Sequence, residues 1–198
     1  MTDDTKTAAV VHASAQVEAD VSIGDGTQVW SGVHVRRGAR IGADCRIGGN
    51  AFIDIDVRIG DRCKILNNAL VFHGAVIEDE VFIGPAACLT NDRRPRAASP
   101  DGTALTDADW TLSGITIERG ASVGAGAVVV AGVRLGAWSM AGAGAVVTTD
   151  VAPQSLVVGT PARHIAWLCK CGSRLSAEHD CPTCGRRYAI TDGHVLPA

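Results

Sequence analysis

The sequence repeats every six residues over most of its length. Stepping by six from Val11, every position up to Leu89 is aliphatic, and the same walk resumes at Ile117 and continues to Val147. A period of six matches neither the 3.6-residue period of a helix nor the two-residue period of a strand. It is therefore the repeat of a larger structural unit.

A smaller residue recurs four positions after each aliphatic one, and glycine often follows the aliphatic residue directly. Small side chains let a backbone turn tightly over a narrow interior, and glycine suits corners that need unusual backbone angles. These glycines are Gly24, Gly42, Gly48, Gly60, Gly84, Gly124, Gly136 and Gly142. The pattern predicts an all-β fold, a parallel β-helix of about seven coils with three hexapeptides in each. Stacked coils lie about 4.8 Å apart.

The composition fits a thin core and restricts the partners. Hydrophobic residues make up 46% of the 198 residues but aromatic residues only 4%, so Val, Ile and Ala fill the core. A net charge of -3 argues against a general nucleic-acid binder. We find neither an 18-residue apolar run nor a signal peptide in the opening MTDDTKTAAV, and so expect a cytoplasmic protein with no membrane partner.

The repeat is interrupted once. Leu89 and Ile117 are 28 residues apart, which is not a multiple of six, so residues of about 92–114 are expected to protrude as a loop. Long loops on regular scaffolds are often functional. Arg93 and Arg96 in this loop are candidates for phosphate binding, and the alternative is a solvated basic turn.

A different pattern begins after the repeat, so we expect a β-helix domain at 1–167 and a tail at 168–198. Residues 162–167 are expected to form a short helix that caps the solenoid. Two cysteine pairs, each followed by glycine, are typical of a zinc ribbon with four thiolate ligands. The pairs are Cys169 with Cys171 and Cys181 with Cys184. The first pair is one residue short of the usual spacing, which leaves His179 as a substitute ligand, and unmetallated thiols are the alternative. Cys45 and Cys63 stand 18 residues apart in the small-residue position and are expected to stack in the core.

Several motifs outside the repeat resemble those of a known family. They are NNALVFHG at 67–74, EDEVFIGP at 78–85, LTND at 89–92, the Pro95-Arg96 pair, AGAGAVVT at 141–148 and VVGTPAR at 157–163. The chain resembles left-handed β-helix N-acetyltransferases of nucleotide-linked amino sugars over residues 12 to about 167. The similar types act on UDP-2-acetamido-3-amino-2,3-dideoxyglucuronate and on dTDP-3-amino-3,6-dideoxyhexoses.

The resemblance implies a homotrimer that transfers acetyl from acetyl-CoA to a sugar amine. The expected setting of this reaction is surface polysaccharide synthesis. It makes Asn91 a catalytic candidate that orients the amine, although an Asn here also suits a turn. His73 lies 18 residues before Asn91, hence one coil away, and could accept the amine proton, although a lone surface His is often inert. Glu78 and Asp79 are candidates for binding sugar hydroxyls; the alternative is that they form a solvated corner.

The resemblance also implies cofactor-binding residues. The small residues Gly142, Ala143 and Gly144 would let the pantetheine arm approach the backbone, and Arg163 would reach a CoA phosphate. Trp30 and Trp138 would stack on a base or lie in a subunit interface.

Two other classes stay open. The same solenoid carries γ-type carbonic anhydrases, which need a closely spaced His pair that the six histidines of this chain do not provide. A trimeric scaffold without acyltransferase activity is the non-enzymatic alternative.

Overall fold

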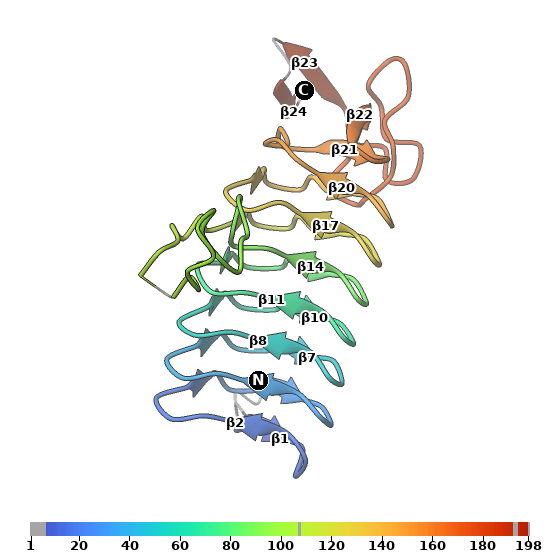
Figure 1. The fold of residues 1–198 in the computed structure, drawn as a ribbon. Helices are drawn as coiled ribbons and strands as arrows, with labels where there is room; N and C mark the ends of the chain where they lie inside the picture. Colours follow the sequence, from blue (N-terminus) through green and yellow to red (C-terminus); the bar gives the residue numbers. More distant parts are fainter. Residues whose placement is uncertain (1–6, 107, 192–193, 198) are drawn as a thin grey trace.

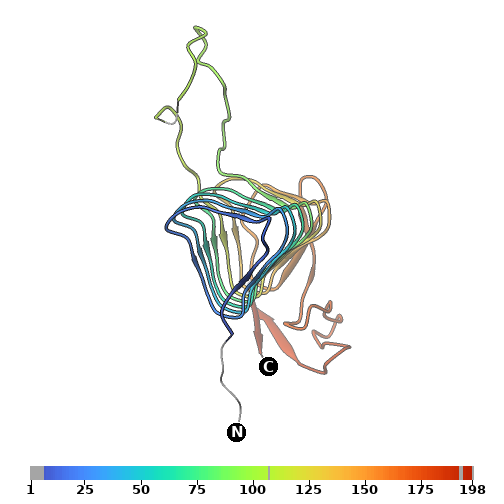
Figure 2. The ribbon, with the colours of Figure 1, turned by 90° about the horizontal axis from the view of Figure 1, so that it is seen from below.

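The chain forms a three-sided parallel β-helix (Figures 1 and 2). The computed structural model describes residues 7–106, 108–191 and 194–197, and these contain 24 strands and no helix. Residues 1–6, where the sequence showed no signal peptide, lie outside the described part. Within that part, no helix is long and apolar enough to cross a membrane.

Three parallel sheets form the sides of the prism, and we call them A, B and C. Sheet A contains β1 (Val10–Val11), β4 (Gln28–Val29), β7 (Arg46–Ile47), β10 (Lys64–Ile65), β13 (Phe82–Ile83), β16 (Ser122–Val123), β19 (Met140–Ala141), β21 (Ser155–Val158) and β22 (Arg163–Trp167). Sheet B contains β2 (Gln16–Val17), β5 (His34–Val35), β8 (Phe52–Ile53), β11 (Leu70–Val71), β14 (Cys88–Leu89), β17 (Val128–Val129) and β20 (Val146–Val147). Sheet C contains β3 (Ser22–Ile23), β6 (Arg40–Ile41), β9 (Arg58–Ile59), β12 (Val76–Ile77), β15 (Thr116–Ile117) and β18 (Arg134–Leu135). A fourth sheet pairs β23 (Tyr188–Thr191) with β24 (His194–Pro197).

The register of the ladders explains the period of six. Within the uninterrupted stretches of the repeat, each strand pairs with the one 18 residues further on, as Val29 pairs with Ile47. The aliphatic residue of every strand points inward, and from Val29 to Val147 these side chains are at most 4% exposed. Val11 and Val17 of the first coil are 42% and 40% exposed, because no described coil lies beneath them. The predicted all-β parallel β-helix of about seven coils is confirmed.

Four-residue corners join the strands, and they stack into three edges of the prism, which we name A–B, B–C and C–A after the sheets that they join. The left-handed backbone region falls on the third corner residue, as in Gly26 (φ 71°) and Asn50 (φ 57°), and not on the glycine that follows the aliphatic residue. A Cβ on Gly24 would lie 2.6 Å from the backbone of the next coil. The prediction of unusual angles for these glycines was wrong: close stacking of coils requires them.

The interruption is a protruding loop, as predicted. It occupies residues 90–115 between β14 and β15 and projects from the B–C edge (Figure 2). The ladder continues across it, because Val76 of β12 pairs with Thr116 of β15. The scaffold is therefore not disturbed by the insertion.

The end of the solenoid differs from the expectation. Residues 163–167 form strand β22, antiparallel to β21, and not the predicted short helix. The strand completes the exposed edge of sheet A, a role that a helix cap was expected to play. Gln154 holds the start of the tail at Leu168. Its side-chain Nε2 donates to the Leu168 carbonyl (2.7 Å), and its backbone carbonyl accepts from the Leu168 amide (2.7 Å).

Candidate functional site

His73 has one ring nitrogen bound and one available. It lies on the B–C edge directly after β11, and its Nδ1 is 2.7 Å from the Ile55 carbonyl of the coil below. A carbonyl only accepts, so Nδ1 carries the proton and donates it. In the neutral ring this leaves Nε2 with the lone pair that a general base needs.

The buried carboxylate of Asp54 supports this corner. Only 8% of the residue is exposed, and its Oδ2 accepts from the His73 amide (3.1 Å). Its Oδ1 accepts from the Ile55 amide (2.8 Å) and from Nη1 of Arg36 (3.0 Å). The Nδ1 contact joins His73 to Ile55, and the Asp54 side chain therefore holds the backbone of both residues. Sequence reasoning missed Asp54; the available signal was an acidic residue in the corner position that glycine often fills.

Asn91 lies where the loop leaves the coil, two residues after Leu89. Leu89 pairs with Val71, and His73 lies two residues after Val71. The backbone carbonyl of Asn91 accepts from the amide of Ser113 (3.0 Å), so the two ends of the loop meet here. Leu112 lies over Gly74, where an added Cβ would come within 2.9 Å of its Cδ1. Both predicted catalytic residues therefore lie on the B–C edge near the base of the loop, and their joint action stays a prediction.

Glu78 and Asp79 lie on a different edge, C–A, and both are engaged in stacking. Glu78 Oε2 accepts from the Arg119 amide (2.8 Å), and Asp79 Oδ1 accepts from the Asp61 amide (2.9 Å). The structure does not bring them to His73 within one chain. Their contact with sugar hydroxyls stays a prediction.

Glu80, on the same edge, forms ion pairs with two arginines. Its carboxylate meets the Arg119 guanidinium (2.8 Å) and that of Arg62 (3.1 Å). These hydrogen bonds lower the pKa of Glu80 to about 2, and the one from Arg119 has the largest effect. The acidic corner is therefore a structural feature of coil stacking.

The two predicted loop arginines have different surroundings. Nε of Arg93 donates to the Ala131 carbonyl (2.8 Å), so this side chain ties the base of the loop to the next coil. Arg96 lies further out and lines a hollow of the loop together with Arg94. Only Arg96 is placed as a phosphate ligand would require.

The A–B edge exposes a row of backbone donors. On the other two edges, many second-corner amides are bound by carboxylates, as the Ala43 amide is by Asp61 (2.8 Å). In the described part of the chain, the amides of Ala125 and Ala143 have no acceptor. Gly142 and Gly144 flank Ala143, and nothing lies within 4 Å of a Cβ placed on Gly144. The predicted cofactor residues therefore form an accessible edge with free N–H groups.

The remaining predicted binding residues surround the top of the solenoid. Arg163 is exposed and lines a hollow of about 380 Å³ beneath β22. Trp138 stacks on Gly120 and lies 5.7 Å from Nζ of Lys170, so it joins the solenoid to the tail and is covered there. Trp30 is 50% exposed at the A–B edge of the lower coils. Cys45 and Cys63 are buried and stacked in the core, as expected.

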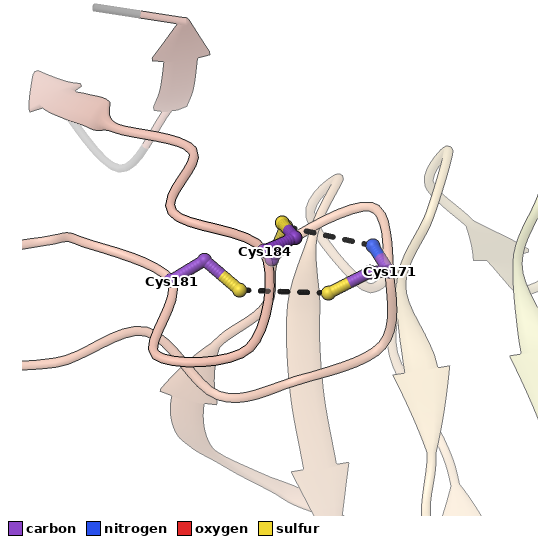
Figure 3. Close-up of side chains that lie close together, drawn as sticks. Cys171, Cys181 and Cys184 are labelled. Carbon is purple, nitrogen blue, oxygen red and sulfur yellow. Dashed lines mark hydrogen bonds between the residues drawn. The ribbon is translucent and has the colours of Figure 1, made fainter.

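The four cysteines of the tail converge on one point (Figure 3). Their sulfur atoms lie within 4.8 Å of one another, with 3.4 Å between Cys169 and Cys184 and 3.5 Å between Cys171 and Cys181. Burial alone would raise the pKa of Cys169, but hydrogen bonds from the Cys171 amide and the Tyr188 hydroxyl lower it to about 6. His179 is not part of the group. The short spacing between Cys169 and Cys171 therefore does not prevent both from joining it.

No histidine cluster occurs among the residues that the structure describes. The tail cysteines are the one group of three or more His, Cys, Asp or Glu side chains there whose ligand atoms converge.

Comparison with known families and proteins finds the same repeat. The bacterial transferase hexapeptide (six repeats) model matches residues 20–54, and the model for the hexapeptide repeat of succinyl-transferase matches residues 38–72 and 114–149. One relative is the dTDP-3-amino-3,6-dideoxy-alpha-D-galactopyranose 3-N-acetyltransferase of Aneurinibacillus thermoaerophilus, 42% identical over 81 residues, which are 40% of this chain and 42% of the relative. Another is the bifunctional protein GlmU of Rubrobacter xylanophilus, 30% identical over 188 residues, covering 77% of this chain and 40% of the relative. The chain thus spans less than half the length of these curated relatives.

The fold is also similar to a solved enzyme with ligands. PerB from Caulobacter crescentus, in complex with CoA and GDP-perosamine, is 26% identical with a TM-score of 0.52, over 81% of this chain and 58% of that one. A mutant of the GDP-perosamine N-acetyl transferase of the same organism is 25% identical with a TM-score of 0.54 over the same shares. The chain is a hexapeptide-repeat β-helix protein, similar in sequence and fold to N-acetyltransferases of nucleotide-linked amino sugars.

Proposed function

We propose that the protein transfers an acetyl group from acetyl-CoA to the amine of a nucleotide-linked amino sugar, as the resemblance implied. The observation that carries the proposal is a histidine whose Nε2 is left available by its Nδ1 contact, on the same edge as Asn91 and near the base of the loop. The names of the similar enzymes support it, since they act on a dTDP-linked and a GDP-linked amino sugar. Surface polysaccharide synthesis and a 3-amino acceptor remain part of the proposal.

The chemistry asks little of the protein. The neutral sugar amine attacks the thioester carbonyl, and the carboxamide oxygen of Asn91 accepts a hydrogen bond from that amine and directs its lone pair. The attacking nitrogen becomes cationic and passes a proton to Nε2 of His73. The tetrahedral intermediate then expels CoA thiolate, which takes up a proton. Alignment and proton removal of this kind are each worth orders of magnitude in rate.

We propose that acetyl-CoA lies along the A–B edge. The free amides of Ala125 and Ala143 can donate to the carbonyl oxygens of pantetheine, and the exposed Arg163 suits a phosphate. Pro85 fills the equivalent corner position of an earlier coil, so proline is compatible with this turn. Ala143→Pro therefore removes one N–H with little effect on the fold, and should weaken CoA binding about tenfold. Ser31→Pro, at the same position near the other end of the edge, is the matched control.

Sheet B supports the proposed homotrimer. After Gln16 and His34 of its first two strands, its outward side chains form an apolar row from β8 onward, whereas sheets A and C carry arginines and a lysine. The row consists of Phe52, Leu70, Cys88, Val128 and Val146. The sheet lies between the edge with His73 and the edge with Gly142, so subunits packed through it would enclose both. Light scattering of Leu70→Glu, which should dissociate the assembly, tests this proposal.

We also propose that the cysteine group holds a structural Zn²⁺. Four thiolates at Zn–S distances of about 2.3 Å place sulfurs about 3.8 Å apart in a tetrahedron. The sulfur separations of 3.4 and 3.5 Å are close to this value. The metal would be held by Cys169, Cys171, Cys181 and Cys184 and would fix the fold of the tail.

The decisive experiment measures thiol release from acetyl-CoA with a panel of UDP-, dTDP- and GDP-linked 3-amino and 4-amino sugars. Amine-dependent release with one member establishes the reaction and names the sugar. His73→Gln should lower kcat about 10²- to 10⁴-fold with little change in KM, whereas His12→Gln, at the far end of the solenoid, should not. Silence across the panel together with no CoA binding would favour the scaffold alternative.

A further inference from the structure

The protruding loop encloses a hollow of its own. A short turn closes the tip, where the Ser99 amide donates to the Thr103 carbonyl (2.9 Å) and the Leu105 amide to the Ala97 carbonyl (3.1 Å). Between the outgoing residues 92–96 and the returning residues 109–113 lies a cavity of about 440 Å³. This is within the size range of small-molecule sites.

Among the residues that the structure describes, the two arginines of the hollow have no acidic partner. Asp92 and Asp109 line the same hollow, but Asp92 accepts from the Arg94 backbone amide (2.7 Å), and Asp109 accepts from the amide and hydroxyl of Thr106 (2.8 and 2.7 Å). In the described part of the chain, no carboxylate oxygen lies within 4.0 Å of the guanidinium of Arg94 or Arg96. Two guanidinium groups in one cavity, neither of them paired with the carboxylates that line it, form a site for an anion with several oxygens.

An indole lies in the wall of the same cavity. Trp110 is 36% exposed and follows Asp109 on the returning side of the loop. Aromatic side chains of this kind stack on nucleobases whatever their sequence, and guanidinium forks bind phosphate oxygens in pairs. A ligand that uses both features has a base and a phosphate chain.

We propose that the loop hollow binds a nucleoside diphosphate group, with the base on Trp110 and the phosphates on Arg94 and Arg96. Two ligands carry this chemistry: the nucleotide of the amino sugar and the 3′-phospho-ADP part of CoA. The link to the sugar nucleotide rests on the proposed function. Ser113 lines the hollow and also binds Asn91, so a sugar attached to the diphosphate would extend toward the catalytic pair.

The test is calorimetric titration of the full-length protein with UDP, dTDP, GDP and CoA, each separately. Arg94→Gln combined with Arg96→Gln should weaken binding of one nucleoside diphosphate about 100-fold, and Trp110→Ala should weaken it at least about fivefold. Arg58→Gln, an exposed arginine on sheet C, should leave it unchanged. Circular dichroism confirms that the variants fold, as expected for substitutions outside the ladders.

The outcomes separate the two ligand sources and the two proposals. Weaker CoA binding with unchanged nucleoside diphosphate binding would assign the hollow to the acyl donor. Unchanged binding of all four ligands, or no binding by the parent protein, would overturn the inference. Acetylation of a nucleotide amino sugar with an unaltered KM in the double variant would refute the inference alone. Loss of UDP, dTDP or GDP binding in the variants, in a protein inactive on the whole sugar panel, would refute the proposed function alone.

Discussion

Asp54 should be the most costly carboxylate of the solenoid to replace by its amide. It accepts hydrogen bonds from the amides of Ile55 and His73 and from Arg36. Asp54→Asn keeps one acceptor oxygen. If that oxygen stays toward Ile55, the new NH₂ group faces the His73 amide, which is also a donor.

The magnitude follows from these contacts. A buried amide without an acceptor costs about 1–3 kcal/mol, and the partly exposed pair with Arg36 adds roughly 0–1 kcal/mol after solvent screening. We therefore expect Asp54→Asn to lower the free energy of unfolding by about 1–4 kcal/mol. The His73 ring, whose Nδ1 contact lies beside this corner, should lose alignment, so kcat should fall with it.

Urea denaturation at a fixed protein concentration measures the first effect, since an assembly makes stability concentration-dependent. The matched control is Asp56→Asn, the same change two residues on, at an exposed position whose left-handed backbone (φ 55°) an asparagine also adopts. Equal midpoints for the two variants would refute the reasoning. A large loss of stability in Asp54→Asn with unchanged turnover would refute only the argument that Asp54 positions His73.

Three further results are expected. Because the pKa of Glu80 is lowered to about 2 in the folded state, its stabilising ion pairs are present above pH 4.5 and are lost as the pH falls toward 2; Glu80→Gln should flatten the dependence of Tm on pH between 5 and 2. Gly42→Ala should lower the urea midpoint more than Gly126→Ala, although only Gly126 has a positive φ (64°), because a Cβ on Gly42 would lie 2.6 Å from the next coil; the reverse order would contradict the stacking argument. Elemental analysis should find one Zn²⁺ per chain, and chelation or Cys181→Ser should lower Tm while sparing thiol release; loss of turnover from a folded protein would show that the tail is not only structural.

The regular part of this fold could be predicted from the sequence because the information is local and repeated. An inward aliphatic residue every six positions fixes the register, and the insertion after Leu89 is visible as a break in it. The identity of the corner residues was less informative. Glycine has two uses, positive φ and close approach, and only the stacked coils distinguish them.

The site could be predicted in part for the same reason. His73 and Asn91 are 18 residues apart, so their adjacency follows from the repeat. The proton position on His73 depends on a carbonyl of another coil, and the cavity with Trp110 depends on how an aperiodic loop folds. Residues 162–167 illustrate the remaining difficulty: a short segment joins an available sheet edge, and that choice depends on tertiary contacts that no local pattern records.

The ladder that continues from Val76 to Thr116 across the loop separates two kinds of change. Arg93, Leu112 and Ser113 contact the coils, but substitutions and length changes within residues 94–111 alter what surrounds Asn91 without a cost in coil stacking. The coils of the β-helix and the specificity for the acceptor can thus change independently during evolution. Mutation of one contiguous segment, the loop, could select a new acceptor.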